Sequence, residues 1–346
     1  IGAGGALGAN TTADYNIAMG YAAMAANTTG TRNTAIGHNA YTASDTEDDN
    51  IAIGYNAMTT NTAGGVENLA VGNYALDALT SGDGNVALGH MTLTATDTGR
   101  HNVGVGYRAL YTNTGGDNNV AVGKESLFYN TTGEDNIALG NQSLTANTTG
   151  TANTAVGANA LTANTTGQDN IAIGKNTLSA NTTGVRNIAI GRAAYYSSDT
   201  ENDNIAIGYG AMTVNTAGGT QNTAVGNYAL DDLTSGDNNT AIGYQTGEAN
   251  ITGGEKNTLL GSHCRTSSVG SDNQLVLGFN VVGNANNSMC FGNAGTDSAI
   301  AFGETSISAP SDIRLKENIS DDVAGLSFIN DLRPVTFNWK KEKDIP

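Results

Sequence analysis

The sequence predicts an all-β protein: a parallel β-roll, or β-solenoid, of about 17-residue coils that assembles as a homotrimeric fibre. One motif, Asn-x-Ala/Gly-x-Gly, recurs at a nearly constant interval through most of the 346 residues. Gly, Asn, Thr and Ala dominate, whereas only 14% of residues are charged and 6% aromatic, too few large side chains for one globular core. Residues 50–68 (NIAIGYNAMTTNTAGGVEN) return almost unchanged as residues 204–222 (NIAIGYGAMTVNTAGGTQN), which indicates block duplication.

The interval of the motif identifies the repeat unit. Its first Asn occupies fifteen positions separated by eleven steps of 17 residues and three steps of 18: 16, 33, 50, 68, 85, 102, 119, 136, 153, 170, 187, 204, 222, 239 and 257. A fixed period of this length is typical of solenoids, in which each repeat contacts only its neighbours. We expect about 15–18 coils stacked ~4.8 Å apart.

Residues 136–150 (NIALGNQSLTANTTG) illustrate one coil. The alternation in NIALG predicts a short β-strand, with Ile137 and Leu139 on one face. Gly140 is expected to turn the chain, and QSLTA to form a second short strand that carries Leu144. NTTG closes the coil, because Asn and Gly tolerate left-handed backbone angles and Thr hydroxyls can hydrogen-bond the turn.

The orientation of these strands and the thin core predict how chains associate. We expect the motif Ile, Val and Leu side chains to point into the roll and the motif Ala to face partner chains. Asn136 recurs one coil away as Asn119 and Asn153, so the amides are expected to bond along a ladder. Three large apolar residues per coil make a thin core, and three rolls side by side would bury the Ala face.

Composition excludes several classes of function. The formal net charge is −17, and residues 1–310 hold 25 Asp and Glu against 9 Lys and Arg, so a basic nucleic-acid groove is excluded. No apolar run approaches the ~20 residues of a membrane span, so no membrane insertion is expected. The chain opens within the repeat (IGAGGALG) and without Met, so we expect a fragment of a longer protein.

No cofactor and no metal ion are expected. The four His residues show no ligand spacing: His38, His90, His101 and His263. Tyr residues that directly follow the motif Gly are expected to cover the corner of the coil, with glycan binding as the alternative: Tyr21, Tyr55, Tyr107, Tyr209 and Tyr244.

The motifs NTAIG, NIAIG and NVALG resemble the head repeats of trimeric autotransporter adhesins over about residues 1–303. That resemblance implies parallel β-rolls in a homotrimer. The spacing of motif glycines shrinks after Gly261, at Gly278, Gly292 and Gly303, so the roll is expected to taper. We therefore expect a shaft over residues 1–262, shorter coils over residues 263–306, and a different domain from residue 307.

Residues 307–346 depart from the repeat and contain all three prolines and the only Trp of the chain. LSFINDL is expected to be a helix and PVTFNWK a strand, the start of an α+β domain. The motifs SDIRLKENI and LRPVTFNWK, in this order, resemble the start of the C-terminal intramolecular chaperone of phage tail fibres and endosialidase tail spikes.

The chaperone resemblance implies trimerisation of the fibre followed by self-cleavage between Pro310 and Ser311. Ser311 would be the nucleophile and Lys316 its general base, since a desolvated Lys can take the hydroxyl proton of Ser. Neighbours that match the motif would fix the geometry: Asp312, Arg314, Glu317 and Asn318. The alternative is that Ser311 and Lys316 are ordinary surface residues of a linker.

The sequence thus predicts a structural trimeric fibre of a phage tail that attaches the virion to a glycan or protein receptor on the host surface. The alternative is a trimeric adhesin or filament subunit on a bacterial cell surface. Enzymatic activity is expected at most as a single self-cleavage in the chaperone domain, because no paired carboxylates stand out in the shaft.

Overall fold

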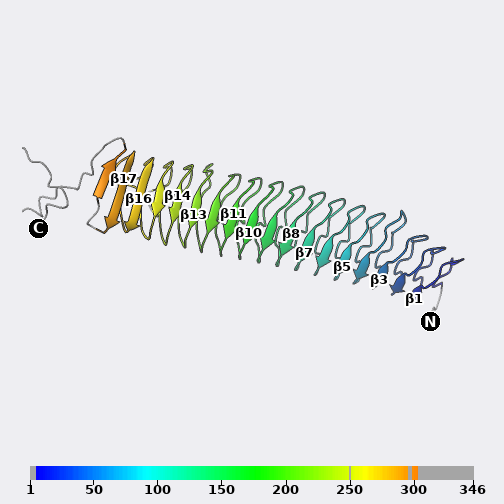
Figure 1. Ribbon diagram of the computed structural model, residues 1–346. Coiled ribbons are helices and arrows are strands. Elements are labelled where there is room, and N and C mark those ends of the chain that lie inside the picture. The colour runs from blue at the N-terminus through cyan, green and yellow to red at the C-terminus, as the bar shows by residue number, and fades with distance from the viewer. Residues whose placement is uncertain (1–4, 249–250, 295–297, 303–346) are drawn as a thin grey trace, which may run out of the picture. The chain divides into compact units, whose positions relative to one another are not determined.

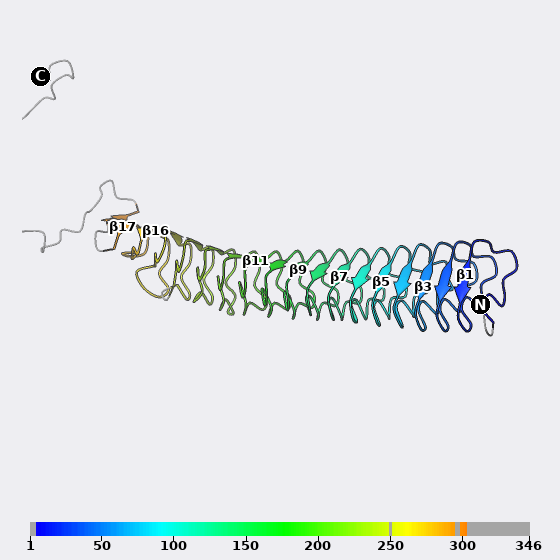
Figure 2. The same ribbon diagram turned by 90° about the horizontal axis from the view of Figure 1, so that it is seen from below.

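The computed structural model describes residues 5–248, 251–294 and 298–302, which form one continuous β-solenoid with no helix among them (Figure 1). One short strand per coil follows the next along a single wall of the stack, as the view from below also shows (Figure 2). The strands are Ile17–Met19 (β1), Thr34–Ile36 (β2), Ile51–Ile53 (β3), Leu69–Val71 (β4), Val86–Leu88 (β5), Val103–Val105 (β6), Val120–Val122 (β7), Ile137–Leu139 (β8), Thr154–Val156 (β9), Ile171–Ile173 (β10), Ile188–Ile190 (β11), Ile205–Ile207 (β12), Thr223–Val225 (β13), Thr240–Ile242 (β14), Thr258–Leu260 (β15), Gln274–Phe279 (β16), Ser288–Asn293 (β17) and Ser298–Ala301 (β18).

The strands pair in parallel and in the register of the repeat. Ile137 lies opposite Thr154, 17 residues later, and the 18-residue step between Ile51 and Leu69 keeps the same register. The coil between β16 and β17 is shorter, because Gln274 pairs with Ser288. The last strand, β18, instead returns antiparallel to β17 and ends the parallel stack among the described residues. The predicted parallel roll is therefore confirmed.

The motif glycine turns the chain at the end of each strand. Gly140 has a φ of 144°, and a Cβ there would lie 2.5 Å from the carbonyl oxygen of Gly157 in the next coil. Only a residue without a side chain allows the coils to stack this closely at the corner.

The second strand predicted for QSLTA is wrong. Gln142 and Leu144 have left-handed φ angles of 54° and 52°, so the chain curves where a strand would run straight. Its backbone still bonds the neighbouring coils: Gln142 N donates to Lys124 O at 2.9 Å and Leu144 N to Ala160 O at 2.9 Å. Left-handed angles at residues other than Gly cost about 1–3 kcal/mol each; these bonds and the burial of Leu144 offset that cost.

The predicted orientation of the motif residues is also wrong. Ala138 is completely buried inside the roll, whereas Ile137 is 40% and Leu139 37% exposed on its outer face. The interior beneath the strands has room for little more than a methyl group. At Gly104, which replaces the motif Ala, even a Cβ would lie 2.6 Å from Cγ2 of Thr92 and 3.3 Å from Cδ1 of Leu93.

One column of large side chains forms the centre of the core, and Leu79 and Leu233 add a second buried Leu to two coils. Leu144 and its equivalents are fully buried and lie in one column: Met24, Tyr41, Met58, Leu76, Leu93, Leu110, Leu127, Leu161, Leu178, Tyr195, Met212 and Leu230. The single row of large residues explains why this roll is thin.

Two ladders of buried Asn side chains connect the coils. In the predicted ladder, Asn136 Nδ2 donates to Asn119 Oδ1 at 3.1 Å and to Gly150 O at 2.8 Å. The second ladder uses the Asn of the closing turn, where Asn147 Nδ2 donates to Asn130 Oδ1 at 2.8 Å. The motif ladder is therefore confirmed, and it satisfies polar groups that water cannot reach.

Candidate functional site

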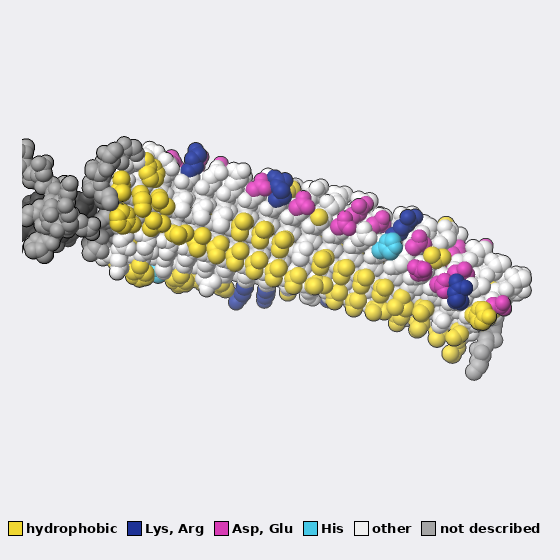
Figure 3. All heavy atoms as spheres, in the orientation of Figure 1, with side chains coloured by type: hydrophobic (Ala, Val, Ile, Leu, Met, Phe, Trp, Pro, Cys, Tyr) yellow, Lys and Arg dark blue, Asp and Glu magenta, His cyan; other side chains and the backbone are white. Residues whose placement is uncertain are grey.

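The outer faces of the strands form a continuous apolar surface, here named the strand-face stripe, which consists of the first and third residues of β1 to β15. Five of these thirty positions are Thr, and the others are Ile, Val, Leu or Met; none is charged. Figure 3 shows it as a yellow band along the roll. Its most exposed members include Ile17 at 56%, Met19 at 48% and Leu260 at 43%.

The stripe exists because of the motif itself. Each of these strands turns its central residue inward, which is Ala in all but β6 (Gly104) and β15 (Leu259), and so presents its first and third side chains outward. The parallel register places them above those of the next coil. Contiguous apolar surfaces of this extent mark sites where another protein surface binds. The stripe is thus a candidate association surface.

The margin at which the strands begin is acidic. The two residues before each motif Asn, and before Gln274 in its place, form this acidic edge. It holds four cations, Arg32, Arg100, Arg186 and Lys256, against thirteen carboxylates: Asp14, Asp48, Asp49, Glu67, Asp83, Asp117, Glu134, Asp135, Asp169, Asp203, Asp237, Glu255 and Asp272. In Figure 3 most magenta side chains gather along this margin of the yellow band.

Some charges of the acidic edge pair from coil to coil. Arg32 Nε lies 2.6 Å from Asp49 Oδ1, and Arg186 Nε lies 2.6 Å from Asp203 Oδ1. The hydrogen bond from each Arg lowers the pKa of its Asp partner below the ordinary value. Because carboxylates outnumber cations here, the edge remains strongly negative.

The margin at which the strands end has the opposite character. The two residues after each motif Gly form this aromatic–basic edge, which holds one carboxylate, Glu125, and four cations: Arg108, Lys124, Lys175 and Arg192. Dark blue side chains project from this margin in Figure 3. The stripe therefore separates a negative edge from a weakly positive one.

Aromatic rings contact one another from coil to coil along the aromatic–basic edge in two runs, some stacked and most edge to face. The first is Tyr21, His38, Tyr55, Tyr74, His90 and Tyr107, with ring centroids 5.0–6.2 Å apart. The second is Tyr209, Tyr228, Tyr244, His263 and Phe279, at 5.3–6.3 Å. The guanidinium of Arg108 lies 5.1 Å from the ring centroid of Tyr107, and that of Arg192 lies 5.8 Å from Tyr209. These rings cover the corners of the coils, as the sequence predicts.

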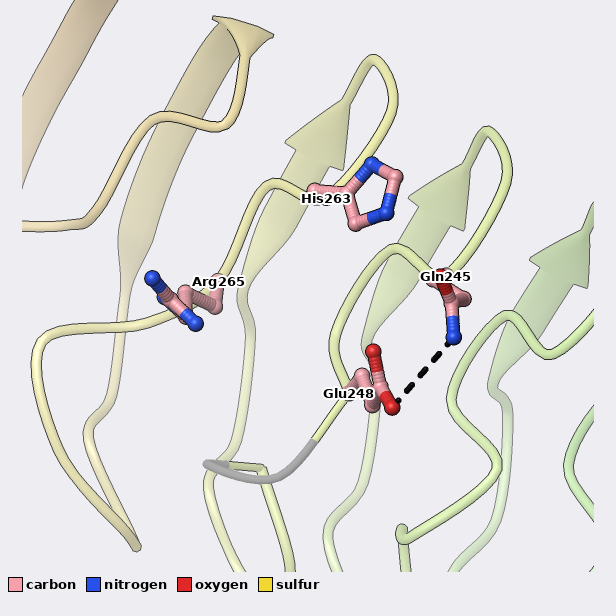
Figure 4. Close-up of a pocket in the computed structure, with 4 residues that line it drawn as sticks. All are labelled: Gln245, Glu248, His263 and Arg265. Atoms are coloured by element: carbon pink, nitrogen blue, oxygen red, sulfur yellow. Dashed lines mark hydrogen bonds between the residues drawn. The ribbon is translucent and has the colours of Figure 1, made fainter. Parts of the chain in front are cut away.

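One pocket of about 190 Å³ lies near the C-terminal end of this edge, lined by Gln245, Glu248, His263 and Arg265 (Figure 4). Gln245 Nε2 donates to Glu248 Oε1 at 3.4 Å. The four polar side chains come from adjacent coils and leave the pocket open to solvent. None of the four is a hydroxyl or thiol nucleophile, and Nδ1 of His263 lies 2.7 Å from Oγ of Ser262, its neighbour in the chain.

The described part of the chain, residues 5–248, 251–294 and 298–302, contains neither a metal-binding cluster nor a membrane-spanning helix. No group of three or more His, Cys, Asp or Glu there is placed to hold a metal ion. Across those same residues, no helix is long and apolar enough to cross a lipid bilayer.

The predicted catalytic residues Ser311 and Lys316, and the Pro310–Ser311 bond, lie outside the described residues. The association surface and its charged edges were not predicted from the sequence in this form. The signal for the edges is present, since Asp or Glu repeatedly precedes the motif Asn.

A comparison with protein families found a similarity at the end of the chain. Residues 311–345 match the family described as chaperone of endosialidase. Neither the comparison with curated proteins nor that with solved structures found a match. A parallel β-solenoid followed by this match fits a protein of the tail-fibre and endosialidase type.

Proposed function

We propose that this chain is the shaft of a homotrimeric phage tail fibre that mediates attachment to the host surface. Residues 1–262 would be the shaft, residues 263–306 its tapering end, and residues 307–346 the start of the chaperone domain. The observation on which the proposal depends is the strand-face stripe of the solenoid, together with the chaperone match at residues 311–345.

The stripe supplies the driving force for assembly. Burying a Val, Leu or Ile side chain completely contributes roughly 1.5–3 kcal/mol. The stripe residues are already partly buried, so each would contribute a fraction of that, repeated over twenty-five apolar positions. Three chains whose stripes face a common axis would remove this surface from water. The number three follows the trimerising chaperone family that the end of the chain resembles.

The chaperone domain would template the three chains and then be removed. In this proposal Lys316 takes the hydroxyl proton of Ser311, and the Ser311 oxygen attacks the Pro310 carbonyl carbon. The Pro310–Ser311 amide bond then breaks, and its nitrogen receives the proton from Lys316. Water hydrolyses the ester that still joins Pro310 to the Ser311 oxygen, which releases the C-terminal fragment. Removal of the template would make unfolding of the fibre irreversible, because unfolded chains could no longer reassemble. The rate of unfolding would then determine how long the fibre lasts.

Attachment to a glycan or protein receptor on the host completes the proposal, and the fibre would belong to the virion tail. A stiff rod of stacked coils suits a part that spans the distance between a particle and a cell. The test uses the protein with the chaperone-matching residues 311–345 attached.

The molar mass of the purified protein, measured by light scattering, tests the trimer. Three times the mass of one chain is expected, with rods in electron microscopy. A folded monomer with the same solenoid signature in circular dichroism would contradict the proposal.

A further inference from the structure

We infer that neighbouring copies of this chain meet along the two edges of the stripe, with the acidic edge of one copy against the aromatic–basic edge of the next. This pairing would set all copies parallel. The inference rests on the proposed function, because it takes the stripe as the surface through which copies associate.

Each coil presents both edges, one on either side of its strand. In the coil of β10, Asp169 lies two residues before Ile171 and Lys175 lies two residues after Ile173. Both side chains are exposed, and neither forms an ion pair with any residue that the structure describes. When stripes face a shared axis, the margin where strands end in one chain adjoins the margin where strands begin in the next.

The chemistry of the two edges is complementary. The acidic edge has thirteen carboxylates for its four cations, and the aromatic–basic edge has four cations for one carboxylate. The second edge also carries Tyr hydroxyls, which can donate hydrogen bonds to carboxylates. Desolvation by burial, with a smaller contribution from neighbouring Tyr209, raises the pKa of Tyr228, so this hydroxyl keeps its proton. Complementary potentials of this kind select the orientation of a partner.

The stripe alone cannot select that orientation. Its residues repeat from coil to coil, so an antiparallel face-to-face pair would bury a similar apolar surface. An antiparallel pair, however, places acidic edge against acidic edge. Like charges brought together oppose such a complex, and specificity often arises from this kind of repulsion.

In the central coils, the cations of one edge lie at the same level as carboxylates of the other. The four cations of the aromatic–basic edge occupy the central coils, between Arg108 and Arg192. The acidic edge of the same coils, β6 to β11, contains four carboxylates, Asp117, Glu134, Asp135 and Asp169, and two cations, Arg100 and Arg186. Parallel chains with little stagger would therefore bring the two sets into contact.

Cross-linking of engineered cysteines in the full protein with its chaperone domain tests the pairing. Asp169→Cys is combined in turn with Ala158→Cys, Lys175→Cys or Arg192→Cys. These three positions of the aromatic–basic edge lie in successive coils, so together they allow for neighbouring chains that are shifted by one coil in either direction. Each variant is treated with a short bismaleimide and run on a denaturing gel. Native Cys264 and Cys290 are buried and present throughout, so the unmodified protein gives the background.

At least one double variant is expected to yield a covalent trimer, whereas each single variant yields only monomer. In a parallel trimer, each Asp169 lies at a different contact between neighbouring chains, so two copies of Asp169 are too far apart to be cross-linked. Light scattering on the same samples separates the two hypotheses, since a monomeric mass would contradict the proposed function itself. A trimeric mass with no cross-link in any double variant would overturn the edge pairing, and so would dimers from Asp169→Cys alone.

Discussion

The side-chain Nδ2 of Asn153 donates to Oδ1 of Asn136, one coil earlier, at 3.2 Å. Oδ1 of Asn153 in turn accepts the backbone NH of Asn170, one coil later, at 3.1 Å. Both side chains are fully buried. Each amide thus links three successive coils, and it is satisfied only when those coils stack in the 17-residue register. The hydrogen bonds of the ladder therefore fix the alignment of successive coils, and this thin fold depends on them more than on apolar packing.

Replacing Asn153 with Ala should therefore destabilise the roll. The change leaves the backbone NH of Asn170 without its acceptor. It also removes one of two side-chain donors to Gly167 O, which keeps the bond from Asn164 Nδ2 at 3.1 Å. An unsatisfied buried polar group costs about 1–3 kcal/mol. Thermal melting followed by circular dichroism should show a clear fall in midpoint. Asn141→Ala, at an exposed position outside the ladders, is the matched control, and an equal fall in both variants would contradict the structural role of the ladder.

Ala172→Asp should disrupt the fold of the coil itself. Ala172 is completely buried beneath β10, so the substitution places an unpaired carboxylate in the interior and forces apart atoms that leave room only for a methyl group. Loss of solenoid signal and rapid proteolysis near this coil are expected. Ala152→Asp, at an exposed position with a left-handed φ of 56°, should behave like wild type. A fully folded Ala172→Asp protein would show that the Ala face is not interior.

Asp77 and Asp231, equivalent residues of the duplicated block, should make stability depend on pH. Burial raises the pKa of each to about 6, and Asp231 is also affected by Asp232 and Glu248. An Asp in an unfolded chain titrates near about 3.9. The folded state thus binds the proton more tightly, so the free energy of unfolding falls as pH rises from about 4 to about 6 and stays lower above that range.

The double variant Asp77→Asn and Asp231→Asn should flatten this dependence and melt at a higher temperature than wild type at pH 8. Melting curves between pH 4 and pH 8 provide the measurement. Asp45→Asn, a change at an exposed carboxylate, should keep the wild-type slope. A double variant with the wild-type slope would show that other groups set the pH dependence.

Ser311→Ala and Lys316→Ala should each abolish self-cleavage of the protein with its complete chaperone domain while leaving trimer formation intact. The reason is a division of roles: the Ser–Lys pair performs the cleavage, whereas packing of the domain templates the chains. A denaturing gel should show a C-terminal fragment from wild type alone. If wild type stays uncut, this domain remains on the fibre as a trimerisation domain and is not a protease. If both variants are cut like wild type, the assignment of Ser311 and Lys316 is wrong.

The period of the motif determined most of what could be predicted about the fold. Steps of 17 and 18 residues fix the parallel register, and the recurrence of Asn136 predicts its ladder, because identical residues in stacked coils must meet. The second ladder follows from the same reasoning applied to Asn147 and its equivalents. Alternation shows which residues share a face of the strand, but it does not show which face lies inside.

The inverted strand face and the missing second strand have physical causes that the pattern does not contain. Large apolar residues point outward here because Leu144 and the Asn ladders already fill the interior, leaving Ala138 the space beneath the strand. The curved segment depends on left-handed angles at Gln142 and Leu144, residue types that give no signal for them. Of the site, the sequence predicts Ser311 and Lys316 by resemblance, and these assignments stay predictions.

The central claim is that the outward stripe is the surface through which copies assemble, and one comparison of masses tests it directly. The variant Ile171→Asp, Ile173→Asp and Ile190→Asp places three charges on the stripe, whereas the control Thr166→Asp and Thr183→Asp places charges on exposed closing turns. Light scattering of the full proteins should give a trimeric mass for wild type and the control, and no trimer for the stripe variant. A stripe variant that assembles into trimers as wild type does would contradict the account.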